Sequence, residues 1–404
     1  MQTSRIIFHI DINAFYAACE LINDPSLKGK PIVVAHNDVL RKSIILSPSY
    51  EARAYGIKTT MLVRDAYNLC DKIIVVEPKM DLYQKHSALF FAFLEKITTQ
   101  IEAGSIDEAF LDVTLVAKKT DPIRLAQFIQ STLYNKYRLP TSIGIAPNKF
   151  LAKMASNMKK PLGITVLRKR EIDKLLWPLE INKMYGVGKK TNIKLRTIGI
   201  NTIGDLANFQ DKILLEKIIG PTFSKTLTDW ANGIADDFVD PTKYDEISSI
   251  SNSHTFDHDQ IDVIFIKKSL KSLVYTVANR LIKKDLKAKT IGITIKYSDF
   301  HTISRSQSLN NPINEALEIN EIVMELFEEN YEENSLVRLV GVFVNRLSDA
   351  SKTEDYKQLS IFDNLSVAEK ENEIKNILNN VQTRFGDDII QKGYYGYKKE
   401  KEKK

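Results

Sequence analysis

Two adjacent acids, Asp107 and Glu108, interrupt an apolar stretch that reads GSIDEAFLD at residues 104–112. Their apolar neighbours predict a short buried strand, where an ionised carboxylate without a partner is costly. A third acid, Asp11, ends another apolar run at HIDI, 96 positions before Asp107. A bound cation would make these acids tolerable, so we ask which cation and which chemistry they suit.

Carboxylates together with a main-chain carbonyl form an all-oxygen ligand set, which Mg²⁺ accepts when it also binds substrate phosphates. Neighbours in a regular strand point to opposite faces. Asp107 and Glu108 therefore share a ligand only where the backbone bends, as in a hairpin or a bulge. With such a bend, Asp11 and the carbonyl of Ile12 would complete a site for two Mg²⁺ ions, the arrangement that catalyses phosphoryl transfer. The residues alone leave the commoner alternatives open, namely helix or turn caps and solvated acids.

The elements that must position these acids follow from the hydrophobic periodicity. Residues 5–10 read as a strand and lead into a helix on which Phe15, Cys19 and Ile22 recur at helical spacing. We expect further strands at KPIVVAH, at the start of SIILSPSYEARAYG, at AFLDV and at TSIGIA, and a short helix at the end of SIILSPSYEARAYG. Longer helices are expected over 83–101, 123–137 and 148–161. The last of these helices begins at Asn148 and ends at Pro161. This order predicts an α+β fold of ferredoxin-like type with residues 21–79 inserted.

The second half repeats that order after a helical region at about 170–239 and a polar linker, VDPTKYDEISS. We expect strands at 250–256, 289–297, 301–309 and 337–347, and helices at 262–285 and 314–331. The tail from 351 to 404 is charged and poor in core residues, so we expect it to be disordered.

The composition, 43% hydrophobic and 27% charged over 404 residues, is that of a soluble protein with two to four domains. No apolar run approaches a membrane span, and MQTSRIIFHID is no export leader. Cys19 and Cys70 are the only cysteines, which favours a reducing cytosol and argues against a zinc or disulfide scaffold. A net charge of +6 permits a nucleic-acid partner without requiring one. We expect a cytoplasmic monomer.

Four blocks, FHIDINAFYAACE, SYEARAYGIKTTM, SIDEAFLDVT and SIGIAPNKFLAKMASNMKKPLG, resemble the Y-family translesion DNA polymerases, most closely their bacterial DNA polymerase IV (DinB-type) branch. The similarity runs in order from residue 5 to about 347. It implies a right-hand α+β polymerase with a ferredoxin-like palm, small fingers, a helical thumb with a helix-hairpin-helix, and a second ferredoxin-like little finger. The implied boundaries are 1–20 and 80–168 for the palm, 21–79 for the fingers, 169–240 for the thumb, 241–247 for a linker, 248–348 for the little finger and 349–404 for a flexible tail.

The resemblance also implies roles for single residues. Asp11, Asp107 and Glu108, with the carbonyl of Ile12, would hold two Mg²⁺ ions beside the primer 3′-hydroxyl. Glu108 would be the catalytic carboxylate, and positioning and charge would do most of the chemistry. Tyr16 matches the steric gate, whose ring clashes with a ribose 2′-hydroxyl.

The incoming triphosphate is the next implied partner. Tyr50 and Arg53 lie three positions apart on one predicted helical face, and an arginine fork suits phosphate oxygens. The resemblance implies that dNTP is held by Ser47, Tyr50, Arg53 and Lys160. Without the resemblance, Tyr16 would be a core aromatic and Arg53 a solvated surface residue.

Two regions are expected to bind DNA. YGVGKKTNIKLRTIGINTIGDL, residues 185–206, reads as a helix-hairpin-helix in which Gly186 and Gly188 expose N–H groups to a phosphate. Lys189 and Lys190 add charge there, although a purely structural loop remains possible. In the last domain we expect Arg305 and Arg338 to contact the DNA backbone from a sheet face, with salt-sensitive affinity.

The tail carries QLSIF, residues 358–362, which resembles the pentapeptide that binds the bacterial sliding clamp. Spaced apolar side chains in a flexible segment suit an apolar groove. The implied contacts are Gln358, Leu359, Ile361 and Phe362, and the alternative is a patch that folds back onto its own domain.

We therefore expect a low-fidelity, template-directed DNA polymerase for translesion synthesis, without proofreading. Small fingers with GIKTTM would enclose the nascent pair loosely and lower discrimination. Two rivals are a non-catalytic DNA- and clamp-binding scaffold and a nucleotide-cyclising enzyme with the same palm. The intact acids count against the first, and the helix-hairpin-helix and QLSIF against the second. Asn13 replaces the family's commonest second acid, and we attach no consequence to it.

Overall fold

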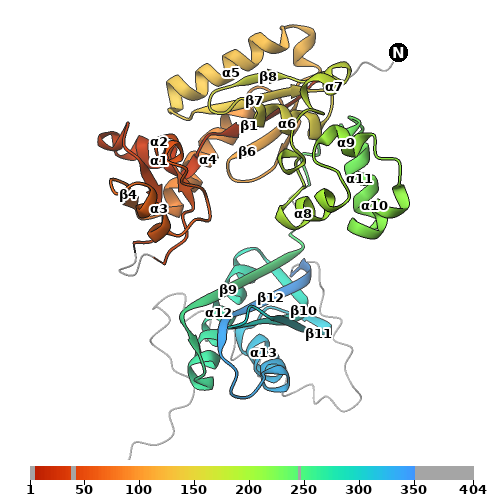
Figure 1. The fold of residues 1–404 in the computed structure, drawn as a ribbon. Coiled ribbons are helices and arrows are strands. Elements are labelled where there is room, and N and C mark those ends of the chain that lie inside the picture. The colour runs from red at the N-terminus through yellow and green to blue at the C-terminus, as the bar shows by residue number, and fades with distance from the viewer. Residues whose placement is uncertain (1–4, 38–41, 244–246, 351–404) are drawn as a thin grey trace, which may run out of the picture. The chain divides into compact units, whose positions relative to one another are not determined.

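The computed structural model describes residues 5–37, 42–243 and 247–350. The chain divides into two compact units, Met1–Glu246 and Ile247–Lys404. Both units combine helices with β-sheet (Figure 1), which confirms the predicted α+β class. No helix in the described ranges is both long enough and apolar enough to span a membrane.

A five-stranded sheet organises the first unit, in the order β5-β6-β1-β7-β8. Its central strand β1 is fully buried and pairs antiparallel with β6 on one side and β7 on the other. The bounds are β1 Ile7–Ile12, β5 Ile101–Ala103, β6 Glu108–Asp112, β7 Thr141–Ala146 and β8 Ile164–Val166. Asp11 near the end of β1 and Glu108 at the start of β6 are therefore neighbours across the sheet.

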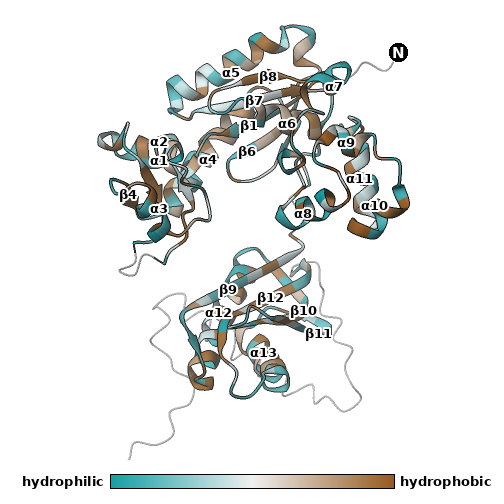
Figure 2. Cartoon of the chain, in the orientation of Figure 1, coloured by the Kyte–Doolittle hydropathy of each residue, from teal (hydrophilic) through white to brown (hydrophobic). Residues whose placement is uncertain are grey.

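Helices cover both faces of this sheet. On one face α4 (Met80–Leu94) and α5 (Pro122–Tyr137) pack on Phe8 and Ile10 of β1. On the other face α6 (Lys149–Met158) packs on Ile7 and opens with Asn148, whose side chain accepts a hydrogen bond from the Leu151 N–H, as predicted. Figure 2 shows both hydrophilic and hydrophobic stretches along α5, as expected of an amphipathic helix.

The predicted C-terminal end of one helix is wrong. The helix predicted over 83–101 stops at Leu94, and residues 101–103 form β5. The reason is a hairpin, in which Ile101 pairs with Leu111 and the Asp112 N–H bonds to the Gln100 carbonyl. Those ladder bonds outweigh the weak helical pattern of this stretch.

A small sheet with its own core lies between β1 and α4. Its strands are β2 (Ile32–Val34), β3 (Ser47–Pro48) and β4 (Ile74–Val76), in the order β3-β2-β4. The short α2 (Tyr50–Ala54) and α3 (Val63–Leu69) pack on it. This segment lies within the residues expected to form the fingers.

The remainder of the first unit is helical, as predicted. Its helices share a core with α6, so they are fixed to the side of the sheet on which α6 lies. They are α7 (Ile172–Leu175), α8 (Lys189–Thr197), α9 (Ile203–Ala207), α10 (Lys212–Ile219) and α11 (Pro221–Ala231).

The second unit has the predicted element order, strand-helix-strand-strand-helix-strand. Its sheet runs β11-β10-β12-β9 with all neighbours antiparallel, and one core joins it to both helices. The first strand in sequence is thus at an edge here, whereas β1 is central in the first unit. The bounds are β9 Ser249–Gln260, α12 Val263–Lys283, β10 Leu286–Tyr297, β11 Thr302–Ile313, α13 Ala316–Asn330 and β12 Val337–Asp349.

Candidate active site

A cavity of about 440 Å³ in the first unit is lined by the end of β1, the start of α1 (Phe15–Asn23), the β3–α2 segment and the β5–β6 loop. Nine residues were expected to bind metal, gate the sugar or hold the triphosphate. Eight of them line this cavity, and Glu108 does not. The eight are Asp11, Ile12, Tyr16, Ser47, Tyr50, Arg53, Asp107 and Lys160.

Two of the three acids lie on paired strands, and Asp107 directly precedes the second strand. Asp11 of β1 stands directly opposite Glu108 of β6, and the Ile12 N–H bonds to the Asp107 carbonyl at 3.0 Å. The turn of the β5–β6 hairpin is the bend that two adjacent acids need in order to share a ligand. The Gly104 N–H closes this turn by donating a hydrogen bond to the Glu108 carbonyl at 2.8 Å. A Cβ at residue 104 would lie 3.0 Å from Glu108 Cγ, so a larger residue at this position would displace the Glu108 side chain.

The donors suit a hard divalent cation, because all of them are oxygen atoms. The carboxylates are nevertheless bonded elsewhere. Asp11 Oδ1 lies 2.6 Å from Lys160 Nζ, Glu108 contacts Lys153, and Asp107 accepts a hydrogen bond from Ser105. Within the described residues, no three His, Cys, Asp or Glu side chains are gathered closely enough to hold one ion. The metal assignment therefore fits by donor chemistry and backbone register, and it stays a prediction.

The pKa values of the two adjacent acids move in opposite directions. Burial raises the pKa of Asp107, and the nearby charges of Asp11 and Glu108 add to that effect. Burial alone would raise the pKa of Glu108, but contacts with His9 and Lys153 outweigh it and lower that pKa to about 2. The Lys153 charge contributes to this lowering, and burial lowers the pKa of His9 itself.

His9 was missed by the sequence analysis. It is fully buried, its Nδ1 lies 2.8 Å from Ser156 Oγ, and its Nε2 lies 3.5 Å from Glu108 Oε2. Ser156 donates its own proton to the Lys153 carbonyl, so it accepts from His9 Nδ1. The available signal was its position two residues before Asp11, which places both side chains on one face of β1.

Lys153 was also missed, although its spacing was visible. Lysines at positions 149, 153 and 160 are separated by four and seven, which is the spacing of one helical face. Each of them is paired with an acid of the sheet, and the pairs are Lys149 with Glu102, Lys153 with Glu108, and Lys160 with Asp11. Only Lys160 had been predicted to be functional.

The expected gate residue, Tyr16, is supported from behind. Its ring stacks on that of the buried Tyr83, with centroids 4.3 Å apart. The Tyr83 hydroxyl donates to Glu20 at 2.8 Å, and Glu20 also pairs with Lys79 at 2.7 Å. Burial, with the charge of Asp107, raises the pKa of Tyr16, so its hydroxyl stays protonated at neutral pH.

The expected triphosphate residues come from β3 and α2. Ser47 is buried in β3, and Ser49 caps α2. Arg53 donates from Nε to the Pro48 carbonyl at 3.2 Å and lies 5.0 Å above the Tyr50 ring. Tyr50 and Arg53 therefore share a helical face, as predicted, and the guanidinium is held at its base.

Asn13 has a clear structural role. It is buried, its Nδ2 donates to Ser142 Oγ at 3.0 Å, and its Oδ1 accepts from the Leu162 N–H at 2.8 Å. These bonds tie the end of β1 to β7 and to the turn that follows Lys160.

The proposed DNA contacts of the first unit lie at the start of α8. Gly186 has φ +89°, a conformation that favours glycine, and Gly188 is the residue before the helix. Lys189 and Lys190 form the exposed first turn. Free N–H groups and two cations therefore meet at one helix end.

The two arginines of the second unit differ in their placement. Arg305 donates to Asn330 at the end of α13 and lies on the side of β11 that carries Ile303, which packs on the core. It therefore faces the helices and not the open sheet face. Arg338 pairs with Asp259 at 3.5 Å and lies 4.9 Å from the Phe300 ring. The predicted clamp-binding residues Gln358, Leu359, Ile361 and Phe362 lie outside the described residues.

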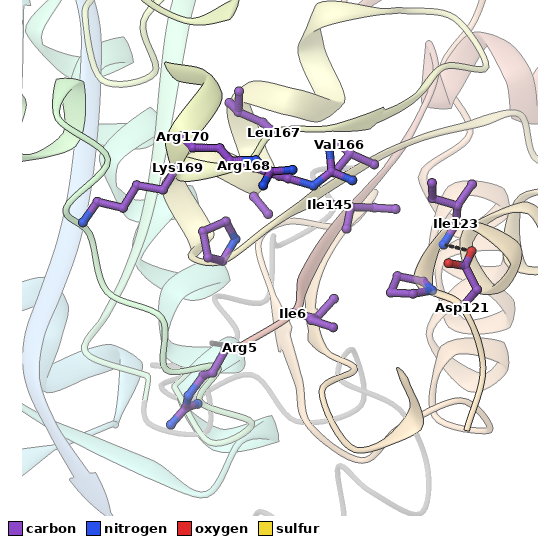
Figure 3. Close-up of a pocket in the computed structure, with 13 residues that line it drawn as sticks. Arg5, Ile6, Asp121, Ile123, Ile145, Val166, Leu167, Arg168, Lys169 and Arg170 are labelled. Atoms are coloured by element: carbon purple, nitrogen blue, oxygen red, sulfur yellow. Dashed lines mark hydrogen bonds between the residues drawn. The ribbon is translucent and has the colours of Figure 1, made fainter. Parts of the chain in front are cut away.

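A larger cavity, about 650 Å³, lies at the start of α5 and the ends of β7 and β8. None of the predicted site residues line it (Figure 3). Its lining is largely apolar, Arg168 is bonded to Glu171 at 3.2 Å, and Lys169 extends away from the apolar residues in Figure 3. Chemistry-bearing groups therefore converge in the smaller cavity.

Comparison with protein-family models gives three matches along the chain. Residues 10–157 match the impB/mucB/samB family, and residues 247–361 match the C-terminal domain of that family. Residues 169–200 match the IMS family HHH motif, which overlaps the predicted helix-hairpin-helix.

Individual relatives align over nearly the whole chain. DNA polymerase IV of Bacillus velezensis is 45% identical over 96% of this chain and 92% of its own. DNA polymerase IV 1 of Bacillus subtilis is 43% identical, over 96% of this chain and 93% of its own length. Among solved structures, a Y-family DNA polymerase chimera of Dbh and Dpo4 gives a TM-score of 0.75 at 26% identity, over 84% of this chain and 98% of that one. DinB from Sulfolobus solfataricus gives a TM-score of 0.58 at 26% identity, over 84% of this chain and 98% of that one.

Proposed function

This chain belongs to the Y family of DNA polymerases, in its DNA polymerase IV (DinB-type) branch, and we propose on that basis how its cavity performs the reaction. It is a DNA-directed DNA polymerase for translesion synthesis, a nucleotidyltransferase that acts on primer–template DNA and dNTPs. One observation carries the mechanism. The paired acids Asp11 and Glu108 adjoin a cavity that also holds the expected gate and triphosphate residues.

Y-family polymerases are metal-dependent, and the oxygen donors support Mg²⁺, two ions per site. Asp11, Asp107, Glu108 and the Ile12 carbonyl would hold them. Bound Mg²⁺ would supply charge to the phosphates and activate the primer hydroxyl. Because Glu108 is ionised at neutral pH, it is ready to bind a cation without losing a proton.

The triphosphate would bind between α2 and the residue after α6. The Tyr50 ring and the Pro48 carbonyl hold the guanidinium of Arg53 at its base, which leaves the terminal nitrogens to form a fork on phosphate oxygens. Lys160 would add a positive charge from the palm. Ser47 would contribute a hydroxyl. This binding energy orients the α-phosphate for in-line attack.

Tyr16 would select the sugar. A ring fixed against Tyr83 cannot retreat from a ribose 2′-hydroxyl, so a ribonucleotide meets a steric clash. Discrimination between bases would be weak, because small fingers enclose the nascent pair loosely.

DNA and protein partners would bind elsewhere on the chain. The exposed first turn of α8, with Gly186, Gly188, Lys189 and Lys190, suits a backbone phosphate. Arg338 and Arg305 remain our candidates in the second unit, and QLSIF is our candidate for the bacterial sliding clamp. We further propose a monomer in the cytoplasm, which the two free cysteines support.

Primer extension with Mg²⁺ and four dNTPs tests the site. We expect Glu108→Ala to abolish extension, while Glu77→Ala, an exposed acid paired with His36, leaves it unchanged. Full activity of Glu108→Ala would overturn the metal assignment. The scaffold alternative is not favoured, and it predicts no extension by the unmodified chain. The cyclase alternative predicts a template-independent product.

A further inference from the structure

Lys153 lies beside two of the three acids at once. Its Nζ contacts Glu108 Oε2 and lies 4.0 Å from Asp11 Oδ2. Its side chain is only 12% exposed, although it is a lysine in the middle of a ten-residue helix. A buried lysine is normally there because a partner requires its charge.

The surroundings of Lys153 keep that charge in place. The Lys153 carbonyl accepts the Ser156 hydroxyl at 2.9 Å, and Ser156 in turn accepts from the buried His9. The ammonium also lies 5.9 Å from the centre of the Tyr185 ring, within the range of a cation–π contact. The Glu108 contact, the Tyr185 ring and the low exposure of the side chain therefore leave the ammonium little freedom to move into solvent.

The charges at the site are nearly balanced without any metal. Three carboxylates, Asp11, Asp107 and Glu108, are faced by two ammonium groups, those of Lys153 and Lys160. An ammonium group occupies the same oxygen lone pairs that a metal ion needs, and it repels a divalent cation in a medium of low effective dielectric. Lys153 and a metal ion therefore compete for Glu108 and Asp11.

We propose that Lys153 is a positioning residue that acts as the internal counter-ion of the acids: it holds Glu108 before a cation binds and weakens the site for a divalent cation. The cation then binds firmly only when a triphosphate adds negative charge. Metal binding thereby becomes coupled to nucleotide binding, as reciprocal linkage requires. This inference rests on the proposed role of Asp11 and Glu108 as metal ligands.

The test measures metal binding directly. Full-length protein without DNA is titrated with Mn²⁺, an EPR-visible probe, with and without dNTP. Lys153→Met removes the charge and keeps the length, so we expect Mn²⁺ to bind at least about fivefold more tightly and dNTP to enhance binding less. The kcat of primer extension falls, because Glu108 has lost its contact. Lys153→Arg keeps the charge and restores the weak binding of the unmodified protein.

Lys149→Met is the matched control, since it makes the same change one helical turn away, on the lysine paired with Glu102. It leaves Mn²⁺ affinity unchanged. Equal or weaker Mn²⁺ binding by folded Lys153→Met overturns the inference, and Lys153→Gln replaces that variant if it does not fold. If Asp11→Asn leaves Mn²⁺ binding by the unmodified protein unaffected, the metal assignment itself fails, and this inference fails with it.

Discussion

The ring of Tyr16 lies almost parallel to that of Tyr83, with an interplanar angle of 13° and centroids 4.3 Å apart. Tyr83 is fixed in turn by Glu20, which is itself buried and paired with Lys79. The residue expected to exclude ribonucleotides is thus backed by a second ring that the sequence analysis did not identify.

Tyr16→Ala should admit ribonucleotides, because the clash disappears. We expect the preference for dNTP over rNTP to fall by about a hundredfold, equivalent to about 2.7 kcal/mol of transition-state discrimination. Tyr83→Leu should lower the same ratio by a smaller factor, since it removes only the support. The measurement is kcat/KM for single dNTP and rNTP additions. Unchanged selectivity in Tyr16→Ala would exclude the gate role.

Asn13→Ala should weaken nucleotide binding through the turn after Lys160. It leaves the Leu162 N–H without its acceptor, at a cost of about 1–3 kcal/mol. We expect KM for dNTP to rise about tenfold with a smaller change in kcat. Ser142→Ala is the control, because it removes the contact between Ser142 and Asn13 and leaves the Leu162 bond in place. A KM that rises equally in both variants would contradict a specific effect on the Lys160 turn.

Glu102 should make the stability of the first unit depend on pH. Burial raises the pKa of this carboxyl, but Lys243, the Asp240 N–H and Lys149 outweigh burial and hold the pKa below its usual value. A folded-state pKa below the unfolded one means that the stabilisation is complete above the unfolded value of about 4.3 and is lost as pH falls through the folded value.

We therefore expect Glu102→Gln to lower the free energy of unfolding by about 3 kcal/mol at pH 7. The difference from the unmodified protein should begin to shrink below about pH 4, where Glu102 becomes neutral in the unfolded chain, and it should disappear as pH falls through the lower folded-state pKa. Urea denaturation between pH 7 and pH 3.5 measures it, with the exposed Glu95→Gln as control. If the difference in the free energy of unfolding stays constant across this range, the charge of the Glu102 carboxylate does not stabilise the first unit.

The tail motif should act only with a partner. We expect Ile361→Ala with Phe362→Ala to leave primer extension by the isolated polymerase unchanged and to abolish its stimulation by the bacterial sliding clamp. The change Lys357→Ala, next to the motif, serves as control. Stimulation that survives the double change would show that the clamp binds through another surface.

The sequence was sufficient for much of the fold because strong local signals agreed with the final structure. Asn148 capped its helix as predicted, and the element order of the second unit was predicted correctly, whereas strands β4, β5 and β8 of the first unit were not predicted. The helix expected to continue to Ile101 failed because hairpin pairing with Leu111, a tertiary contact, decided that segment. Strand order is equally non-local, so nothing in the local pattern placed β9 at a sheet edge beside β12.

The same limit applies to the candidate site. Residue types and a family resemblance selected eight residues that line one cavity. His9, Lys153 and Tyr83 were missed because each acts through a partner on another element, and one sequence does not reveal such pairing. Arg305 was expected to contact the DNA backbone from a sheet face, and the strand register, which a one-residue shift would reverse, directs its side chain towards Asn330.

The central position of β1 has a consequence for biosynthesis. This strand is translated before both of its partners, which end at Asp112 and Ala146. At about 5–20 residues per second, translation from Ile12 to Ala146 takes about 7–27 s. Until β6 has been translated this largely apolar strand has neither of its neighbours, and Asp11 has no Glu108 opposite it; until β7 follows, one edge of the strand stays unpaired.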